Sequence, residues 1–403
     1  MTLAVEIDPA EAGFDAERLN RIDRHYMRYV DEGKLAGFLA VIARDGQLVH
    51  VAGGGLRDVD AGLPVESDTL WRVYSMTKPI TSVAAMMLWE EGAFELKDPV
   101  AKYLPAFADA RVWAGGSQNK PLTVPAQEPM RIWHLLTHTS GLTYGFHYAE
   151  PLDGVYRAHG FEFGAPGGMD LAACCDAWGV LPLLFEPGTE FNYSVSTDVL
   201  GRLIEVVSGQ TLDAFFEQRI LGPLGMTDTA FHARDADRLA VLYQPGLVRN
   251  DHLGATALSE PAFLSGGGGL VSKAADYHRF TQMLLGEGEL DGVRLLAPRT
   301  LRNMGRNHLP GGAELKAVAR PTISETQNDG MGFGLGFSVV LDPAATKGAA
   351  SQGELAWGGL ASTAFWVDPK ERVTAQFFTQ LVPSSTYPLR SQLRQLVYQA
   401  LVD

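Results

Sequence analysis

The sequence is poor in cysteine and lacks any long hydrophobic run. Its only two cysteines, Cys174 and Cys175, are adjacent and cannot join distant parts of a fold by a disulfide. They indicate small buried side chains in a reducing compartment. No run of about 18 apolar residues is present to span a membrane, and the acidic amino terminus lacks the order of a secretory signal. We therefore expect a cytoplasmic protein.

Basic charge is also scarce. The chain has 33 lysine and arginine residues against 47 aspartate and glutamate residues, a net charge of −14. No cluster of basic residues offsets this balance locally, so neither nucleic acid nor an anionic membrane is an expected partner. With 403 residues, 46% of them hydrophobic, the chain exceeds the usual size of a single core, and we expect two lobes.

The two ends of the chain have similar patterns. Residues 15–33 have the spacing of an amphipathic helix, and a hairpin is predicted around Arg44-Asp45-Gly46. Near the carboxyl end an amphipathic helix at 389–402 follows four predicted strands: 333–342, 353–359, 362–368 and 372–380. We expect one mixed lobe assembled from residues 1–70 and 241–403.

The middle of the chain favours helix. Apolar residues recur at helical spacing in four segments: 76–92, 171–180, 196–208 and 211–221. Gly- and Pro-rich connections such as 114–129 separate them. We therefore expect a mostly helical lobe at 71–240.

A serine–lysine pair opens the first of these helices. A serine hydroxyl is a weak nucleophile until a neighbouring group takes its proton, and Lys78 lies one helical turn after Ser75. Pro79 predicts that the helix begins at about Ser75, where unpaired amides favour developing negative charge. The pattern is short, however, and Ser117 with Lys120 matches it in a predicted loop.

Two further segments carry candidate groups. Tyr193 immediately precedes a predicted helix, from which its phenol could reach a site, although core packing is the commoner role of such a residue. Trp357-Gly358-Gly359-Leu360 joins two predicted strands, and its glycines leave backbone amides open to a ligand, as an oxyanion hole requires. A bulge or tight turn is the structural alternative.

Together these motifs resemble the family VIII carboxylesterases, which are relatives of class C β-lactamases and penicillin-binding proteins. The resemblance extends from about residue 15 to the end of the chain and includes LLTHTSGL (135–142), FEPGTEFNYS (185–194), LGPLGM (221–226) and GGGGLVSKAADYHRF (266–280). It implies a mixed α/β fold of the β-lactamase/transpeptidase type. In that fold an antiparallel sheet is flanked by helices, and the active site lies between it and a helical lobe.

The resemblance also implies a role for each matched residue. Ser75 would be acylated, Lys78 would be its base partner, and Tyr193 would hydrogen-bond both and pass a proton to the leaving alcohol. The amides of Ser75 and Leu360 would form the oxyanion hole. No cofactor and no metal ion is implied. The H-x-x-x-H spacing of His134 and His138 lacks the glutamate of a zinc protease.

Two departures from β-lactamases bear on the substrate. Val195 stands where those enzymes usually have asparagine, and Trp357 stands where they have a lysine that helps to hold the drug's carboxylate. Losing an amide and a cation favours neutral short-chain esters over anionic β-lactams. We expect the substrate to contact Val195, Trp357, Gly358 and Gly359, and the aromatic residues Tyr144 and Phe146 are further candidates, with Tyr148, Phe161 and Phe163 less favoured.

Other functions of the same serine chemistry stay open. A β-lactamase, a D-amino-acid peptidase or an acyltransferase would differ only in what enters the cleft and what accepts the acyl group. A non-catalytic scaffold is disfavoured because the serine, the lysine and the tyrosine are all present. An α/β-hydrolase is disfavoured because no G-x-S-x-G occurs. The predicted partner is a small-molecule ester, and the sequence specifies no oligomeric state.

Overall fold

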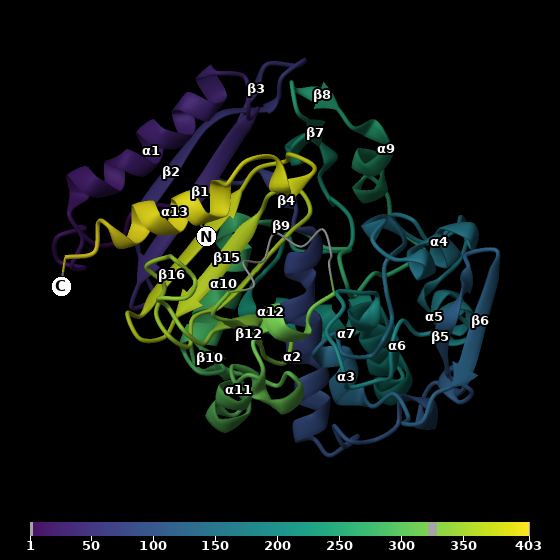
Figure 1. The fold of residues 1–403 in the computed structure, drawn as a ribbon. Helices are drawn as coiled ribbons and strands as arrows, with labels where there is room; N and C mark the ends of the chain where they lie inside the picture. The colour runs from purple at the N-terminus through teal and green to yellow at the C-terminus, as the bar shows by residue number, and fades with distance from the viewer. Residues whose placement is uncertain (1–2, 321–328, 403) are drawn as a thin grey trace.

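An eight-stranded antiparallel sheet dominates one side of the molecule in the computed structural model, which describes residues 3–320 and 329–402 (Figure 1). The strand order is β12-β13-β14-β15-β16-β1-β2-β3. The strands are β1 (Gly37–Arg44), β2 (Gln47–Asp58), β3 (Leu63–Pro64), β12 (Met331–Phe333), β13 (Ser338–Val340), β14 (Leu355–Gly358), β15 (Ala364–Asp368) and β16 (Val373–Phe378). β1 pairs with β16 from Leu39↔Phe378 to Arg44↔Val373, so both ends of the chain build one sheet. The predicted mixed α/β fold is confirmed.

The hairpin prediction at the amino end is confirmed, whereas one strand prediction near the carboxyl end is wrong. Asp45 and Gly46 both have positive φ, as a two-residue hairpin turn requires. The segment 333–342 is not one strand, because it contains only the last residue of β12 and then, after a break, the whole of β13. A tight turn separates them, in which the Gly334 amide donates to the Phe337 carbonyl at 2.8 Å. Gly336 has a φ of 99°, and a Cβ there would overlap the Ser82 side chain, so only glycine fits this turn.

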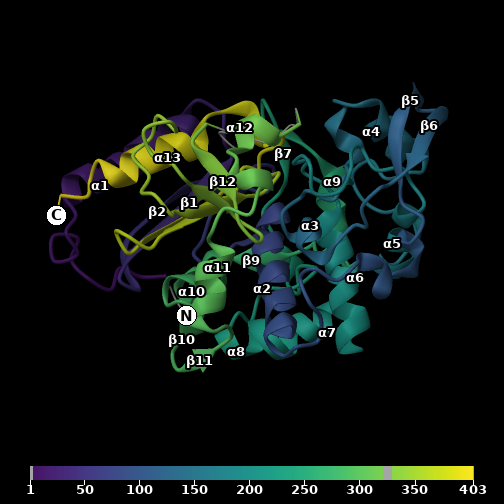
Figure 2. The ribbon, with the colours of Figure 1, turned by 60° about the horizontal axis from the view of Figure 1, so that its bottom comes forward.

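Helices cover both faces of the sheet (Figures 1 and 2). α1 (Ala16–Asp31) and α13 (Leu389–Tyr398) lie side by side on one face, and the buried Tyr26 hydroxyl donates to the Leu389 carbonyl at 2.7 Å. α10 (Ala274–Leu285) packs on the other face, where its Tyr277 ring contacts the Phe365 ring of β15. Successive residues of the central strands, such as Phe38 and Leu39 of β1, therefore enter two separate hydrophobic cores, as the pleat of a strand dictates.

The long helix α2 (Thr77–Glu90) is buried from Thr77 to Leu88, and α6 (Ser196–Ser208) packs against it (Figure 2). The other helices are α3 (Ile132–Leu136), α4 (Pro151–Ala158), α5 (Leu171–Gly179), α7 (Leu212–Phe216), α8 (Gly222–Leu224), α9 (Asp251–Gly254), α11 (Pro298–Met304) and α12 (Leu315–Val318). A helix that is apolar on every side requires such complete enclosure. Within the described ranges no helix has the length and apolar character to cross a bilayer.

Part of the predicted Gly- and Pro-rich connection 114–129 instead belongs to a β-hairpin. β5 (Arg111–Ser117) pairs with β6 (Lys120–Pro125), with a register shift between Trp113 and Gly115. The extra residue of this bulge is Ala114, and the strand continues through Gly115 and Gly116, whose φ values are 127° and 90°. Two further small hairpins pair β7 (Tyr243–Gln244) with β8 (Val248–Arg249) and β10 (Glu289–Leu290) with β11 (Val293–Arg294).

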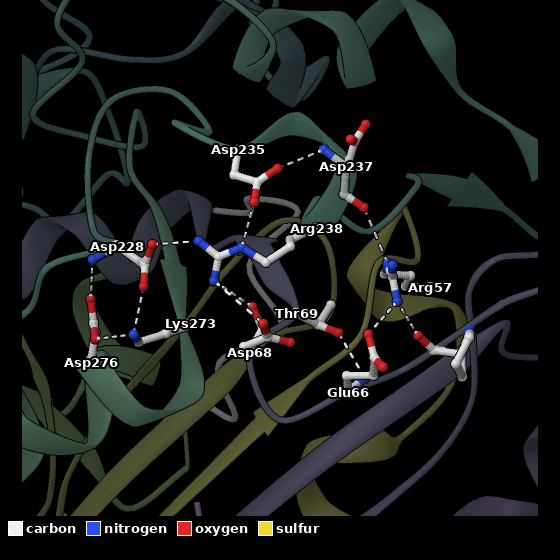
Figure 3. Close-up of polar contacts among 11 residues, drawn as sticks. Arg57, Glu66, Asp68, Thr69, Asp228, Asp235, Asp237, Arg238, Lys273 and Asp276 are labelled. Carbon is white, nitrogen blue, oxygen red and sulfur yellow. Dashed lines mark hydrogen bonds and ion pairs between the residues drawn. The ribbon is translucent and has the colours of Figure 1, made fainter. Parts of the chain in front are cut away.

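A short two-stranded sheet leads directly to Ser75. β4 (Leu70–Arg72) pairs with β9 (Val271–Lys273), and a network of charged side chains surrounds the end of β9 (Figure 3). The network joins two cations to four carboxylates: Lys273 and Arg238 with Asp68, Asp228, Asp235 and Asp276. Hydrogen bonds to these cations lower the pKa of the Asp228 carboxyl against the opposing effect of burial. The network therefore fixes the sheet from which the nucleophile segment leaves.

Candidate active site

Ser75 lies in a sharp turn between β4 and α2. Tyr74 to Met76 form a 3₁₀ turn, and the α-helix begins at Thr77. Tyr74 has a φ of 42°, an uncommon conformation for a residue other than glycine. Pro79 falls in the first turn of α2, where its missing N–H leaves no intrahelical bond unmade. The helix start predicted from Ser75 and Pro79 is therefore observed.

Lys78 contacts Ser75 directly. Its Nζ atom lies 3.2 Å from Ser75 Oγ, 3.0 Å from the Tyr144 hydroxyl and 2.7 Å from the Gly267 carbonyl oxygen. The lysine side chain is almost fully enclosed, at 1% exposure. In a neutral, tetrahedral amine, N–H bonds to Tyr144 and Gly267 leave the lone pair directed at Ser75. The arrangement can thus accept the serine proton without any further movement.

Tyr193 approaches Lys78 with its ring and not with its hydroxyl. Lys78 Nζ lies 4.4 Å from the centre of the Tyr193 ring, and the Tyr193 hydroxyl accepts a hydrogen bond from Trp357 Nε1 at 3.4 Å. Among the described contacts no hydrogen bond joins this hydroxyl to Ser75 or Lys78, contrary to expectation. The ring is fixed between His138 and Trp357, at centroid distances of 4.8 Å and 5.3 Å.

Tyr144 takes the place that was predicted for Tyr193 beside the lysine. Sequence reasoning placed Tyr144 on the cleft wall, whereas its hydroxyl accepts a hydrogen bond from Lys78. Its ring stacks on Phe146 with a centroid distance of 4.6 Å. Burial, with smaller contributions from Asp198 and Tyr193, raises the pKa of Tyr144 well above its usual value. The phenol is therefore a neutral hydrogen-bonding group at neutral pH.

A buried carboxylate holds the third partner of Lys78. Asp198 Oδ1 accepts from the Gly267 amide at 2.9 Å and from the Ser265 hydroxyl at 2.5 Å. A Cβ at position 267 would lie 2.5 Å from Asp198 Oδ2, so this approach requires glycine. Burial raises the pKa of Asp198, and the charge of Lys78 opposes that shift. The run of four glycines at 266–269 is the signal in the sequence for this close approach.

Ser75 and Leu360 lie at the same cleft. The cleft has a volume of about 960 Å³, and both residues line it. Leu360 follows the end of β14, where the Gly359 amide donates to the Thr363 carbonyl at 2.9 Å. No acceptor is found for the Leu360 amide within the described chain, and the Ser75 amide lies in the first turn of a helix, where amides have no intrahelical partner. Two such amides can stabilise an oxyanion.

Aromatic side chains form the mouth of the cleft. Phe146 and Phe163 stack in parallel at 5.6 Å, and both line the cleft together with Met331 and Trp357. Phe163 is 49% exposed, so it lies at the entrance. The wall is mainly apolar, as binding of a neutral substrate requires.

Other predicted aromatic and apolar contacts lie elsewhere. Val195 is buried in the main core at the start of α6 and is not among the residues that line the cleft, so its predicted substrate contact is not seen. Phe161 packs on Trp178, and the exposed Tyr148 ring lies on Arg157.

His147, which sequence reasoning missed, does line the cleft. Burial lowers the pKa of His147 to about 4, against the opposing charge of Asp153, so its ring is neutral at neutral pH.

Comparison with known proteins identifies the family of this chain. The model of the Beta-lactamase family matches residues 22–399. The chain belongs to the Beta-lactamase family. Esterase EstB of Burkholderia gladioli is 32% identical over 421 residues, covering 98% of this chain and 99% of EstB. Lovastatin esterase of Penicillium rubens is 28% identical, with 93% and 96% covered.

A solved structure gives the same result for the fold. The structure of EstCE1, described as a hydrolase with promiscuous acyltransferase activity, superposes with a TM-score of 0.81. The two sequences are 29% identical, and the match covers 95% of this chain and 98% of EstCE1. The predicted resemblance to esterases of the serine β-lactamase-like superfamily is confirmed.

Proposed function

We propose that this member of the Beta-lactamase family is a serine carboxylesterase that hydrolyses short-chain carboxylic esters through an acyl-enzyme on Ser75. The observation that carries this proposal is the 3.2 Å contact between Ser75 Oγ and Lys78 Nζ, in a cleft that is lined by both Ser75 and Leu360. EstB and lovastatin esterase, which share most of their length with this chain, are named as esterases. EstCE1 is described as a hydrolase.

Acylation follows from the contacts of Lys78. The neutral amine takes the Ser75 proton while Oγ bonds to the ester carbonyl carbon, and the carbonyl oxygen becomes an oxyanion held by the amides of Ser75 and Leu360. When the bond to the alcohol oxygen breaks, that oxygen receives the proton from the Lys78 ammonium by way of the Tyr193 hydroxyl. Tyr193 lines the cleft, and this transfer requires its ring to move from the position in which its hydroxyl contacts Trp357.

Deacylation runs through the same groups in reverse. Water loses a proton to Lys78, attacks the acyl carbon and releases the carboxylic acid, and the proton returns to Ser75 Oγ. An alcohol that reaches the acyl-enzyme in place of water gives acyl transfer, the second activity that is named for EstCE1. Acyl transfer is therefore the alternative outcome of the same intermediate.

A matched pair of serine variants tests the proposal. Ser117 carries the other S-x-x-K match and flanks the turn of the exposed β5–β6 hairpin, so Ser117→Ala is the control for Ser75→Ala. With p-nitrophenyl esters of increasing acyl length, we expect Ser75→Ala to lose activity and Ser117→Ala to retain it. Mass spectrometry after reaction with an activated phosphonate should place the adduct on the peptide that contains Ser75. Undiminished hydrolysis by Ser75→Ala would remove this residue from the mechanism.

We also propose a cytoplasmic location, with a small-molecule ester as partner and no role in binding nucleic acid or membranes. Support comes from the net charge of −14 and from the adjacent pair Cys174 and Cys175, which are both buried free thiols.

A further inference from the structure

A single peptide unit contains the proposed oxyanion donor, the Leu360 N–H, and the Gly359 carbonyl. A trans peptide is planar, so the carbonyl and the N–H on its two sides point in opposite directions. Any group that fixes the Gly359 oxygen therefore also sets the direction of the Leu360 N–H. The contacts of Gly359 O consequently bear on the catalytic geometry, provided that the function proposed above is correct.

Arg390 fixes this oxygen from the far end of the chain. It is the second residue of α13, and its Nη2 atom donates to the carbonyls of Gly359 at 2.7 Å and Thr363 at 2.8 Å. The Ser362 amide also donates to the Gly359 oxygen, at 3.1 Å. One guanidinium nitrogen thus bridges both arms of the turn that carries Leu360. The contact fixes the position of this turn and also places a positive charge beside it.

The two glycines of Trp357-Gly358-Gly359-Leu360 make this arrangement possible. A Cβ at Gly358 would overlap the Arg390 guanidinium. A Cβ at Gly359 would overlap both the Thr363 hydroxyl and the carbonyl of Val73, two residues before Ser75. Gly358 therefore admits the cation, and Gly359 lets the turn approach the segment that carries the nucleophile. Close approach of an arginine and of a second backbone segment accounts for both glycines.

We propose that Arg390 is a positioning residue that aims and polarises the Leu360 amide of the oxyanion hole. The guanidinium is permanently charged, and a charged donor makes a stronger hydrogen bond than a neutral one. Donation to the Gly359 oxygen withdraws electron density from the peptide, so the N–H on its other side becomes a better donor. Arg390 thereby supports the transition state without touching the reacting atoms.

The test must separate this role from two others, namely attachment of α13 to the sheet and direct binding of substrate. Arg390→Met removes the bridge, and Arg390→Lys keeps the charge with a different donor geometry. Arg21→Met is the matched control, because Arg21 Nη1 donates to Gln399 Oε1 at 2.7 Å and so contacts the segment that follows the other end of α13. Each variant is assayed with p-nitrophenyl acetate and with the matched thionoester, whose sulfur is a weak hydrogen-bond acceptor.

We expect Arg390→Met to lower kcat for the ester by about 10- to 100-fold, less than the loss of a whole oxyanion donor. KM should change little, and the ratio of ester to thionoester rate should fall because the thionoester depends less on the amide. Arg390→Lys should recover part of the kcat and of the ratio, and Arg21→Met should keep both.

Three results would overturn the proposal. The first is an unchanged kcat in both Arg390 variants. The second is an equal loss of rate for the ester and the thionoester, which would indicate a structural role. The third is a rise in KM alone, which would indicate substrate binding. If Arg390→Met does not fold, Arg390→Lys carries the same comparison. The proposed function fails separately, through an active Ser75→Ala variant.

Discussion

The Tyr144 hydroxyl is one of three groups around the Lys78 amine, and the substitution Tyr144→Phe isolates its contribution. The ring and its 4.6 Å stacking on Phe146 remain, so only the hydrogen bond at 3.0 Å is lost. Without it, Gly267 alone holds one N–H, and the lone pair of the neutral amine is no longer fixed on Ser75. A hydrogen bond to a group that becomes charged contributes about 1.5–3 kcal/mol, which corresponds to about 10- to 100-fold in rate.

Stopped-flow acylation with p-nitrophenyl acetate measures this loss directly, because the first p-nitrophenol released reports acylation and not deacylation. We expect the acylation rate constant of Tyr144→Phe to fall by about 10- to 100-fold, with the fold retained by circular dichroism. Tyr148→Phe is the control, since it removes an exposed hydroxyl that donates to Glu162 in the same part of the chain. An acylation rate equal to that of the unmodified protein would mean that Tyr144 only packs against its neighbours.

Three further predictions follow from the same structure. Nitrocefin turnover should be at least about 100-fold less efficient than ester hydrolysis, because an indole stands where a cation would pair with the carboxylate; equal kcat/KM values would contradict this. Gly267→Ala should lower kcat/KM and destabilise the fold by about 1–3 kcal/mol in urea, because its Cβ would lie 2.5 Å from Asp198 Oδ2. Gly164→Ala is the control, because open space surrounds Gly164, and it should leave both kcat/KM and stability unchanged. Stability in urea should decrease as the pH falls from about 6.5 towards 4. Burial lowers the pKa of His134 to about 3 and the pKa values of His147 and His278 to about 4. The unfolded state therefore binds more protons than the folded state in this range, and protonation favours unfolding. A flat profile across that range would contradict it.

Periodicity predicted most elements of the fold because their burial is one-sided or complete. The helix at 196–208 was predicted with the observed bounds. The hairpin at Asp45-Gly46 was predictable because an Asp-Gly pair is a local signal for a two-residue turn. Glycine was the source of the errors at the predicted strand 333–342 and the predicted connection 114–129. At 334–336 it marks a turn inside a predicted strand, and at 115–116 it continues a strand directly after a bulge, inside a predicted connection. Local sequence does not distinguish these uses, because each depends on what packs against the missing side chain.

The candidate site divides in the same way. The contact of Ser75 with Lys78 was predictable because both lie in one helical turn and share a face. Which phenol would donate or accept at Lys78 was not predictable, because Tyr144 and Tyr193 reach it from separate loops whose relative placement depends on the whole core. Arg390 was missed for a similar reason, since nothing near it in the sequence indicates a contact with a turn that ends β14.

Backbone oxygens hold Lys78 and Arg390, the two basic side chains to which roles are proposed above, and this separates the proposed chemistry from substrate choice. Lys78 is fixed by the Gly267 carbonyl and Arg390 by the carbonyls of Gly359 and Thr363. A carbonyl is present whatever the side chain, so these anchors tolerate sequence change around them as long as the glycines remain. The cleft mouth, in contrast, consists of aromatic side chains such as Phe146 and Phe163, which any substitution alters. Ester and acyl-acceptor preferences can therefore change through the cleft mouth while the proposed Ser–Lys pair and its oxyanion turn stay in place.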